Sequence, residues 1–245
     1  MASRQISRQL DRMRRDWDQR ARENARHYVA TGKEEWSEEE FYRSGETTVD
    51  QYIRNDLENI CQDHDPKQMK VLEIGCGAGR ITKALAGFFA EVYAVDISRE
   101  MVGQAKRAVR DFPNAHIFHN NGKDLSVVRR KWWNRLGIGE PLQLDFAFSV
   151  IVFQHIPSRE IIENYVREVN RLLKPGGLFK FQVQGSSRVE VKEEDSWVGV
   201  SFTPREAREM AERCGFEMRY DSGAGEQYYW LWFFKKCEAG AFADQ

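Results

Sequence analysis

Three glycines alternate with other residues directly after a short apolar run, in the sequence VLEIGCGAGRIT at positions 71–82. Glycine allows the backbone to turn tightly and lets a ligand lie against it, because it has no Cβ. Asp96 follows the next apolar run, 21 residues beyond Gly75, and a carboxylate there can accept two hydrogen bonds from a ribose diol. The two signals together predict a site for a ligand that contains a nucleoside.

The spacing of the glycines separates two classes of such ligand. A dinucleotide site has the pattern G-x-G-x-x-G, with the pyrophosphate at the N-terminus of the following helix. Here Arg80 takes the place of the third glycine of that pattern, and Glu73 precedes the loop. A carboxylate repels a pyrophosphate but attracts a cationic amino-acid group. The residues therefore favour a nucleoside that carries an amino acid over a nicotinamide dinucleotide.

Alternating apolar runs and helical patterns must position these residues, and they begin at residue 70. Apolar runs bounded by turn residues predict strands, and apolar residues spaced three and four apart predict helices. The predicted strands are 70–74, 91–95, 116–119, 144–150, 178–183, 216–220 and 228–234, and the predicted helices are 80–89, 98–110, 158–173 and 204–213. This order predicts an α/β fold with a Rossmann-like, doubly wound, mainly parallel sheet of seven strands. The link between the last two strands is too short for a crossover helix, so we expect an antiparallel last strand.

The first 65 residues predict an N-terminal helical extension, and residues 66–245 the main domain, with an insertion at 185–202. One apolar stripe at helical spacing marks the first helix: Ile6, Leu10, Met13 and Trp17. The arginines of that segment lie mostly off the stripe, as on a solvated basic face. A second helical pattern runs from Val49 to Cys61 and ends at Asp65-Pro66.

Over roughly residues 69–235 the sequence resembles the class I S-adenosylmethionine-dependent methyltransferases, of the small-molecule type with an N-terminal helical lid. The first motif of the family reads (V/I)-L-(D/E)-x-G-x-G-x-G, and residues 71–79 match it. Later segments match in the same order, namely LDFAFSVIVFQHIP at 144–157, RLLKPGGLFKFQV at 171–183 and FTPREAREMAERCGFEM at 202–218. The resemblance implies that the chain binds S-adenosylmethionine, releases S-adenosylhomocysteine and needs no metal.

The resemblance also implies which residues bind the cofactor. Glu73 and Gly75 would surround the methionine part, and Asp96 would accept hydrogen bonds from the ribose hydroxyls. Ile97 and Met101 would pack on the adenine. The other implied cofactor residues are Cys76, Gly77, Gly79 and Arg80 in the loop, Asn121 and Gly122 after the third strand, and Ser149 and Val150 at the end of the fourth. The family usually has an acidic residue where this chain has Asn121, whose carbonyl can still accept a hydrogen bond from the adenine amino group.

Methyl transfer to a nucleophile depends mainly on positioning, and a general base is needed only for a protonated acceptor. His155, just past the fourth strand, is the titratable residue best placed for such a base, and packing that orients the loop is its other interpretation. The segment after that strand contains no N-P-P-Y or D-P-P-Y run, no Pro-Cys pair and no acidic cluster. These absences disfavour methylation of adenine or glutamine amides, of cytosine C5 and of catechols by a metal-dependent enzyme.

Aromatic residues gather in the segments that should surround the acceptor. We expect substrate contacts from four of them: Trp17, Tyr28, Phe153 and Trp197. Aromatic walls suit a flat or apolar organic molecule, or a quaternary ammonium group. Anchoring of the lid to the core is the alternative interpretation of the same rings, and Trp132 and Trp133 are expected at the back of the sheet or at an interface.

Composition limits the remaining function classes. The 37 Lys and Arg residues nearly balance the 38 Asp and Glu residues, so there is no global basic field to attract nucleic acid. The chain lacks an apolar run that could span a membrane, and its four cysteines are scattered without a C-x-x-C pair, as in a reduced cytoplasmic protein. We expect a monomer or homodimer in the cytoplasm that methylates a hydroxyl, amine or carbon of a small organic acceptor. The alternatives are an RNA or protein methyltransferase and a non-catalytic scaffold that keeps the fold.

Overall fold

A computed structural model describes residues 2–128, 142–186 and 196–237. The chain divides into two units, Met1–Pro141 and Leu142–Gln245. Trp132, Trp133 and half of the predicted insertion at 185–202 lie outside the described residues. No helix in the described ranges is long and apolar enough to cross a membrane.

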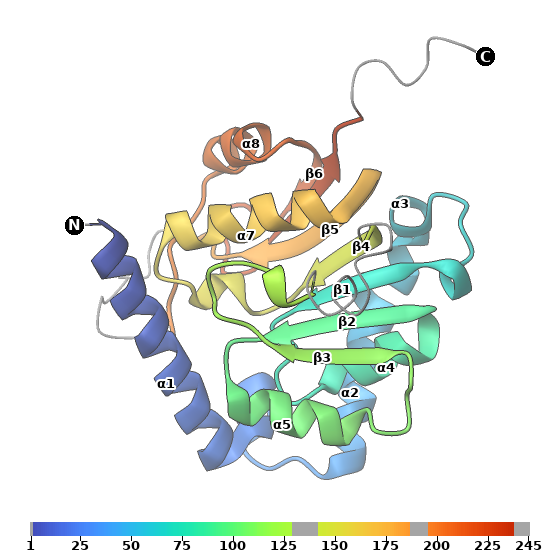
Figure 1. Ribbon diagram of the computed structural model, residues 1–245, viewed down its shortest axis with the longest axis vertical. Helices are drawn as coiled ribbons and strands as arrows, with labels where there is room; N and C mark the ends of the chain where they lie inside the picture. Colours follow the sequence, from blue (N-terminus) through green and yellow to red (C-terminus); the bar gives the residue numbers. More distant parts are fainter. Residues whose placement is uncertain (1, 129–141, 187–195, 238–245) are drawn as a thin grey trace, which may run out of the picture. The chain divides into compact units, whose positions relative to one another are not determined.

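Three parallel strands form the centre of the first unit (Figure 1), namely β1 (Lys70–Ile74), β2 (Glu91–Asp96) and β3 (Ala115–His119). They lie in the order β3-β2-β1, with Lys70 opposite Glu91 and Val92 opposite Ala115. Two crossover helices connect them, α4 (Arg80–Phe88) and α5 (Arg99–Ala108). The central residues of the strands are mostly apolar because the neighbouring strands and helices bury them. Their carboxyl ends meet at one edge, which brings the residues after β1, β2 and β3 together.

The helices before β1 are longer than the sequence pattern indicated. They are α1 (Ala2–Val29), α2 (Glu38–Tyr52), the short turns η1 (Arg54–Asp56) and η2 (Pro66–Gln68), and α3 (Leu57–Cys61). The predicted single helix at 49–61 was wrong in its start and in its continuity. Ser37 and Glu40 form a capping box that begins α2 at Glu38, and η1 separates the end of α2 from α3. The acidic run at 38–40 is the first turn of that helix, where carboxylates favour the helix dipole.

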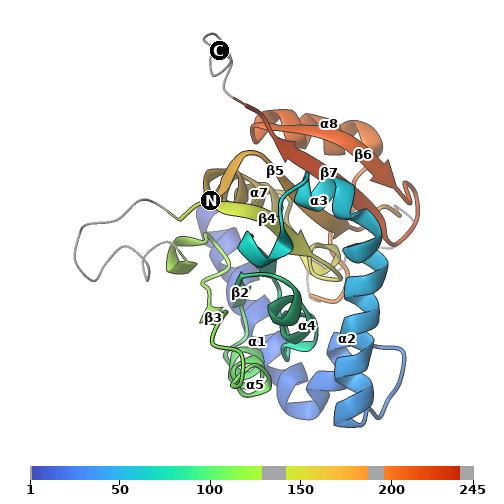
Figure 2. The same cartoon turned by 90° about the vertical axis from the view of Figure 1, so that its right-hand side faces the viewer.

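Both long N-terminal helices pack on the crossover helices. Figure 1 shows α1 beside α5, and Figure 2 shows α2 beside α4. Asn24 interrupts α1 with a non-helical backbone (φ −162°, ψ 80°), and its Oδ1 accepts a hydrogen bond from the His27 N–H at 3.2 Å. Asn24 therefore caps the last turns of α1 and sets the direction of the loop that leads to α2.

The second unit has the strand order β4-β5-β7-β6. Its elements are β4 (Leu144–Ser149), η3 (Phe153–His155), α7 (Arg159–Leu172), β5 (Leu173–Val183), α8 (Pro204–Arg213), β6 (Phe216–Ser222) and β7 (Tyr229–Lys235). β4 and β5 are parallel, whereas β7 is antiparallel to both β5 and β6. The antiparallel last strand is thus confirmed.

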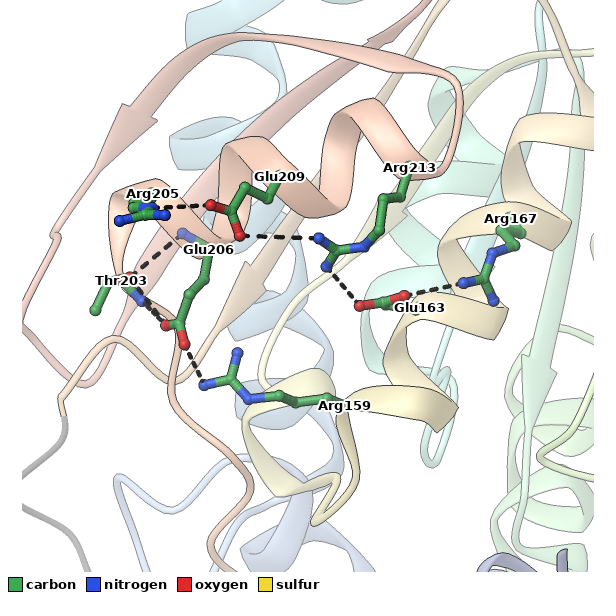
Figure 3. Close-up of polar contacts among 8 residues, drawn as sticks. All are labelled: Arg159, Glu163, Arg167, Thr203, Arg205, Glu206, Glu209 and Arg213. Atoms are coloured by element: carbon green, nitrogen blue, oxygen red, sulfur yellow. Dashed lines mark hydrogen bonds and ion pairs between the residues drawn. The ribbon is translucent and has the colours of Figure 1, made fainter. Parts of the chain in front are cut away.

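Alternating charges tie α8 to α7 on the surface of the second unit (Figure 3). Glu163 on α7 accepts from Arg167 at 2.9 Å and from Arg213 of α8 at 2.7 Å, and Arg159 pairs with Glu206 at 3.0 Å. Thr203 and Glu206 form a second capping box at the start of α8. Exposed pairs of this kind contribute little singly, and two of the three join α8 to α7.

The cysteines differ in their accessibility. Cys61, Cys76 and Cys214 are buried, and Cys237 is exposed, all as free thiols. Within the described ranges, no three His, Cys, Asp or Glu side chains are grouped so that they could hold a metal ion.

Candidate functional site

The glycine loop between β1 and α4 has a backbone that only glycine adopts readily. Gly75, Gly77 and Gly79 have φ angles of 77°, 51° and 83°, in the left-handed region where a side chain is strained. The N–H groups of Gly75 and Cys76 both donate to the Val95 carbonyl, at 2.8 and 3.1 Å. The loop is therefore fixed to the end of β2. The Cys76 side chain packs in the core beside Ala94 and Val102, as a small apolar side chain does.

Glu73 is a buried carboxyl at the end of β1. Its side chain is inside the first unit, where Thr82 Oγ1 donates a hydrogen bond to Glu73 Oε2 at 2.5 Å. Burial raises the pKa of Glu73 to about 7, while the Thr82 hydrogen bond and the Arg80 charge oppose that rise. Sequence reasoning missed Thr82, although its place on the first turn of α4, close to the loop, was the available signal.

Asp96 is a second carboxyl, half-buried at the end of β2. Its Oδ2 accepts from the Gly77 N–H at 2.9 Å and its Oδ1 from the Ser98 N–H at 2.8 Å. Burial raises its pKa to about 6, and these two hydrogen bonds oppose the rise. Two carboxyls that are costly to ionise, on neighbouring strands beside a glycine loop, suit a ligand that brings hydroxyl donors and a positive charge. The donor set fits an adenosyl amino acid.

Helix α1 packs directly on this region. A Cβ on Gly77 would lie 2.7 Å from Val29 Cγ2, and a Cβ on Gly122 would lie 2.7 Å from Leu10 Cδ2. Asp18 Oδ1 accepts from Ser98 Oγ at 2.6 Å and from the Glu100 N–H at 3.3 Å, at the N-terminus of α5. The sequence placed α1 as an extension but did not identify Asp18, because nothing local marks its distant partners.

A cavity of about 560 Å³ opens beside α1 at the end of β3. It is lined by residues of α1, of the start of α5 and of the segment after β3: Arg14, Asp18, Arg99, His119, Asn120, Asn121, Asp124, Ser126 and Val127. Ile97 Cδ1 lies against Gly122, 2.8 Å from the position of a Cβ there. The structure thus brings the predicted adenine contacts Ile97, Asn121 and Gly122 close together.

Three of the predicted cofactor residues make other contacts in this structure. Arg80 Nη1 donates to the Ser44 carbonyl at 2.9 Å and to Thr48 Oγ1 at 3.0 Å, which anchors α2 to α4. Asn121 Oδ1 accepts from the N–H groups of Lys123 and Asp124, so it caps its own turn. Met101 is buried in a cluster with Ala21, Ala25, Phe41 and Ala78.

The predicted substrate residues of α1 also serve packing. Trp17 lies against that cluster, and the Arg20 guanidinium is 4.9 Å from its ring centre. The Tyr28 hydroxyl donates to Glu23 Oε2 at 3.2 Å, and its ring meets His27 edge-on. The packing of Trp17 supports the anchoring interpretation, whereas these contacts of Tyr28 are with its own helix.

In the second unit, β4 ends in a strained turn. Ser149 is buried and Val150 is half-buried, and Ile151 has a φ of 56°, a conformation that is rare for a β-branched residue. Strained backbone of this kind costs on the order of 1–3 kcal/mol and is concentrated at functional sites. Phe153 is a core side chain, because its ring packs against Phe179 and Phe181 and is fully buried.

His155 lies in η3 and is 5% exposed. Its Nδ1 contacts the Trp197 carbonyl, and its ring centre is 5.0 Å from that of Trp197. Its Nε2 is 3.3 Å from Gln154 Nε2. His155 and Trp197, both predicted site residues, are thus in direct contact in the second unit.

Known proteins match this chain in sequence and in fold. Residues 71–177 match a family described as a methyltransferase domain. A ubiquinone biosynthesis O-methyltransferase of Methylococcus capsulatus is 27% identical over 119 residues, which are 48% of this chain and 44% of that protein. A dTDP-3-amino-3,6-dideoxy-alpha-D-glucopyranose N,N-dimethyltransferase of Streptomyces fradiae is 32% identical over 75 residues, which are 31% and 28% of the two chains. The chain spans less than half the length of these relatives.

A solved structure extends the likeness to both units. The magnesium protoporphyrin IX methyltransferase of Synechocystis PCC 6803, solved with bound SAH, matches with a TM-score of 0.63 and 16% identity over 93% of this chain and 100% of that chain. The predicted fold class is confirmed: a Rossmann-like fold with seven strands, the last antiparallel. Residues 71–177 thus match a methyltransferase domain, and the fold is that of class I S-adenosylmethionine-dependent methyltransferases.

Proposed function

We propose that this protein transfers a methyl group from S-adenosylmethionine to a small organic acceptor. The observation that carries the proposal is the pair of carboxyls beside the glycine loop, the buried Glu73 and the half-buried Asp96. When bound, the cofactor supplies a methyl group on a positively charged sulfur, open to attack by a nucleophile.

The chain's own residues have separate tasks in this proposal. The Asp96 carboxylate accepts hydrogen bonds from the ribose diol, and Glu73 provides negative charge for the ammonium group. Gly75 and Gly77 let the backbone approach the ligand. Ile97, Asn121 and Gly122 surround the adenine, and α1 closes over it through Leu10 and Val29.

Three features support a small molecule as the acceptor. The relatives named above are an O-methyltransferase of ubiquinone biosynthesis and an N,N-dimethyltransferase of a sugar nucleotide. Helix α1 packs on the glycine loop, as in a site closed against large substrates. Two arginines of α1 are paired with acids of the same unit, Arg22 with Glu100 at 3.2 Å and Arg26 with Glu38 at 3.3 Å, which weakens the case for RNA.

Calorimetric titration with S-adenosylmethionine and with S-adenosylhomocysteine tests the cofactor. We expect micromolar binding of both, and a loss of about 1–3 kcal/mol in the Asp96→Ala variant, the free energy of a charged hydrogen bond. Asp111→Ala, at an exposed carboxylate of the same unit, is the matched control and should bind normally. If the folded wild-type protein binds neither ligand, the scaffold alternative replaces this proposal.

A second experiment tests the acceptor. Transfer of labelled methyl is measured with panels of small hydroxyl, amine and carbon nucleophiles, and separately with total RNA and total protein. Label in small molecules alone is the expected result, and label in RNA or protein alone would contradict the proposed acceptor class while leaving the cofactor unaffected.

A further inference from the structure

Four hydrogen bonds form a continuous buried chain in the second unit. The Ile151 N–H donates to Gln182 Oε1 at 2.9 Å, and Gln182 Nε2 donates to Gln154 Oε1 at 2.7 Å. Gln154 Nε2 faces His155 Nε2 at 3.3 Å, and His155 Nδ1 faces the Trp197 carbonyl. Gln154, His155 and Gln182 are each 5% exposed or less. The chain links the turn after β4, the strand β5, the turn η3 and the segment at 196–202.

The two ends of this chain fix the role of every atom between them. The Ile151 N–H can only donate, so the oxygen of Gln182 must face it and the Gln182 amide nitrogen must face Gln154. The oxygen of Gln154 then accepts, and its amide nitrogen points at His155. The Trp197 carbonyl can only accept, so the proton of His155 must be on Nδ1.

We propose that Gln182 and Gln154 are positioning residues that hold His155 neutral, with its proton on Nδ1 and its Nε2 lone pair engaged by an amide N–H. When all hydrogen bonds in a series run in the same direction from donor to acceptor, each bond strengthens its neighbours. A proton on Nε2 would face the Gln154 N–H, so protonation requires both amides to turn and the Ile151 N–H to lose its acceptor. His155 therefore orients the turn after β4 and does not serve as the general base in this arrangement.

The same chain explains how the strained turn persists. Ile151 keeps its left-handed backbone at the end of β4 because its N–H is held by Gln182 from the neighbouring strand. On the other side, the Gly199 N–H donates to the Gln154 carbonyl and the Val200 N–H to the Ile156 carbonyl. A Cβ on Gly199 would lie 2.6 Å from the Ile156 carbonyl oxygen, so the segment at 196–202 lies close against η3. The inference deepens the proposed function and rests on it only for the consequence in methyl transfer.

Nuclear magnetic resonance of the full chain, labelled with ¹⁵N-histidine, tests this assignment without cofactor or acceptor. Five histidines contribute signals, and the His155→Gln variant identifies that of His155. At pH 7.5 we expect the wild-type spectrum to show the Nδ1–H tautomer at this residue. An Nε2–H tautomer or a doubly protonated ring would overturn the proposal.

Gln182→Glu provides the sharper test. A carboxylate at 182 can accept from Ile151 but cannot donate to Gln154, so the Gln154 amide should turn and present its oxygen to His155. His155 should then hold protons on both nitrogens at pH 7.5. Gln154→Glu should give the same doubly protonated signal by direct contact, in case the first variant does not fold.

Gln184→Glu is the matched control. Gln184 is a buried residue just beyond β5 on the same face as Gln182, and its Oε1 accepts from the Ser186 N–H at 3.1 Å outside the chain of bonds. The variant should leave the His155 signal unchanged. Equal changes of the His155 signal in Gln182→Glu and Gln184→Glu would show a general effect of negative charge and would overturn the proposal. Because the readout is a tautomer, its failure is distinct from a failure to bind S-adenosylmethionine.

Discussion

The fold opposes the ionisation of Asp96 and Glu73, but the proposed ligand binds their ionised form. Burial raises the pKa of Asp96 from 3.8 to about 6 and that of Glu73 from 4.5 to about 7. Each folded carboxyl thus holds its proton to a higher pH than the unfolded chain does. Their contribution to stability is therefore present below pH 4 and declines as the pH rises towards 6 or 7. Ligand binding should have the opposite dependence on pH.

We predict that the affinity for S-adenosylhomocysteine rises between pH 5 and pH 7, because binding releases protons from these carboxyls. Well below pH 6, the affinity should fall about tenfold per pH unit for each proton that binding releases. Titrations in buffers of different ionisation enthalpy measure the number of protons released. Asp96→Asn should bind weakly and lose the part of the pH dependence near 6. Affinity that is constant from pH 5 to pH 7 would contradict the assignment.

Ile151 offers a test of backbone strain. Alanine shortens the side chain to Cβ and glycine removes it, and of the two only glycine adopts a φ of 56° without strain. We predict that Ile151→Gly is more stable than Ile151→Ala by about 1 kcal/mol in urea unfolding. The control pair is Ile162→Gly and Ile162→Ala in the interior of α7, where the order should reverse by a similar amount. The same order at both sites would contradict the strained turn.

At the scale of elements, the contact between α2 and α4 depends on one glycine. A Cβ on Gly45 would lie 2.1 Å from the Arg80 carbonyl oxygen, whereas a Cβ on Gly103 in α5 would meet only the end of the Arg107 side chain at 3.8 Å. Both glycines are inside helices, where alanine normally stabilises.

We therefore predict opposite effects for the two alanine substitutions. Gly45→Ala should destabilise the protein by about 1–3 kcal/mol, as overpacking does, and Gly103→Ala should stabilise it by about 0.5–1 kcal/mol. Thermal unfolding compares the two variants. A stabilised Gly45→Ala would show that α2 does not lie this close to α4.

The elements that the sequence predicted well are those with strong local signals. Residues 70–74 are a strand as predicted, since an apolar run between polar residues has few alternatives. The start of α2 was missed because the capping box at Ser37 was not recognised in the acidic run. Contacts such as Asp18 with Ser98, or Gln182 with Ile151, join positions tens of residues apart, and no local pattern marks them. Arg80 was assigned to the ligand from its place in the motif, but tertiary packing turns it towards α2.

At the scale of the whole molecule, charge is nearly balanced, with 37 basic and 38 acidic residues. Two arginines of α1 contribute to this balance, since Arg14 pairs with Asp11 at 3.0 Å and Arg22 with Glu100. We predict that the protein is released from immobilised polynucleotide below physiological ionic strength. A variant with Arg4, Arg8 and Arg15 changed to Glu should elute like the wild type. If the wild type is retained on the polynucleotide and the variant is not, the RNA alternative is favoured. Such retention should depend on salt, because phosphate contacts release counterions.

The uneven burial of the four cysteines makes the unmodified chain suitable for site-directed labelling. Burial raises the pKa of the Cys76 and Cys214 thiols, and Cys61 is buried as well, so none of the three should react quickly with a maleimide. Cys237, two residues beyond the end of β7, is exposed. A fluorophore should therefore attach at a single position without mutagenesis. Purification without a reductant should, by the same chemistry, yield covalent dimers linked through Cys237.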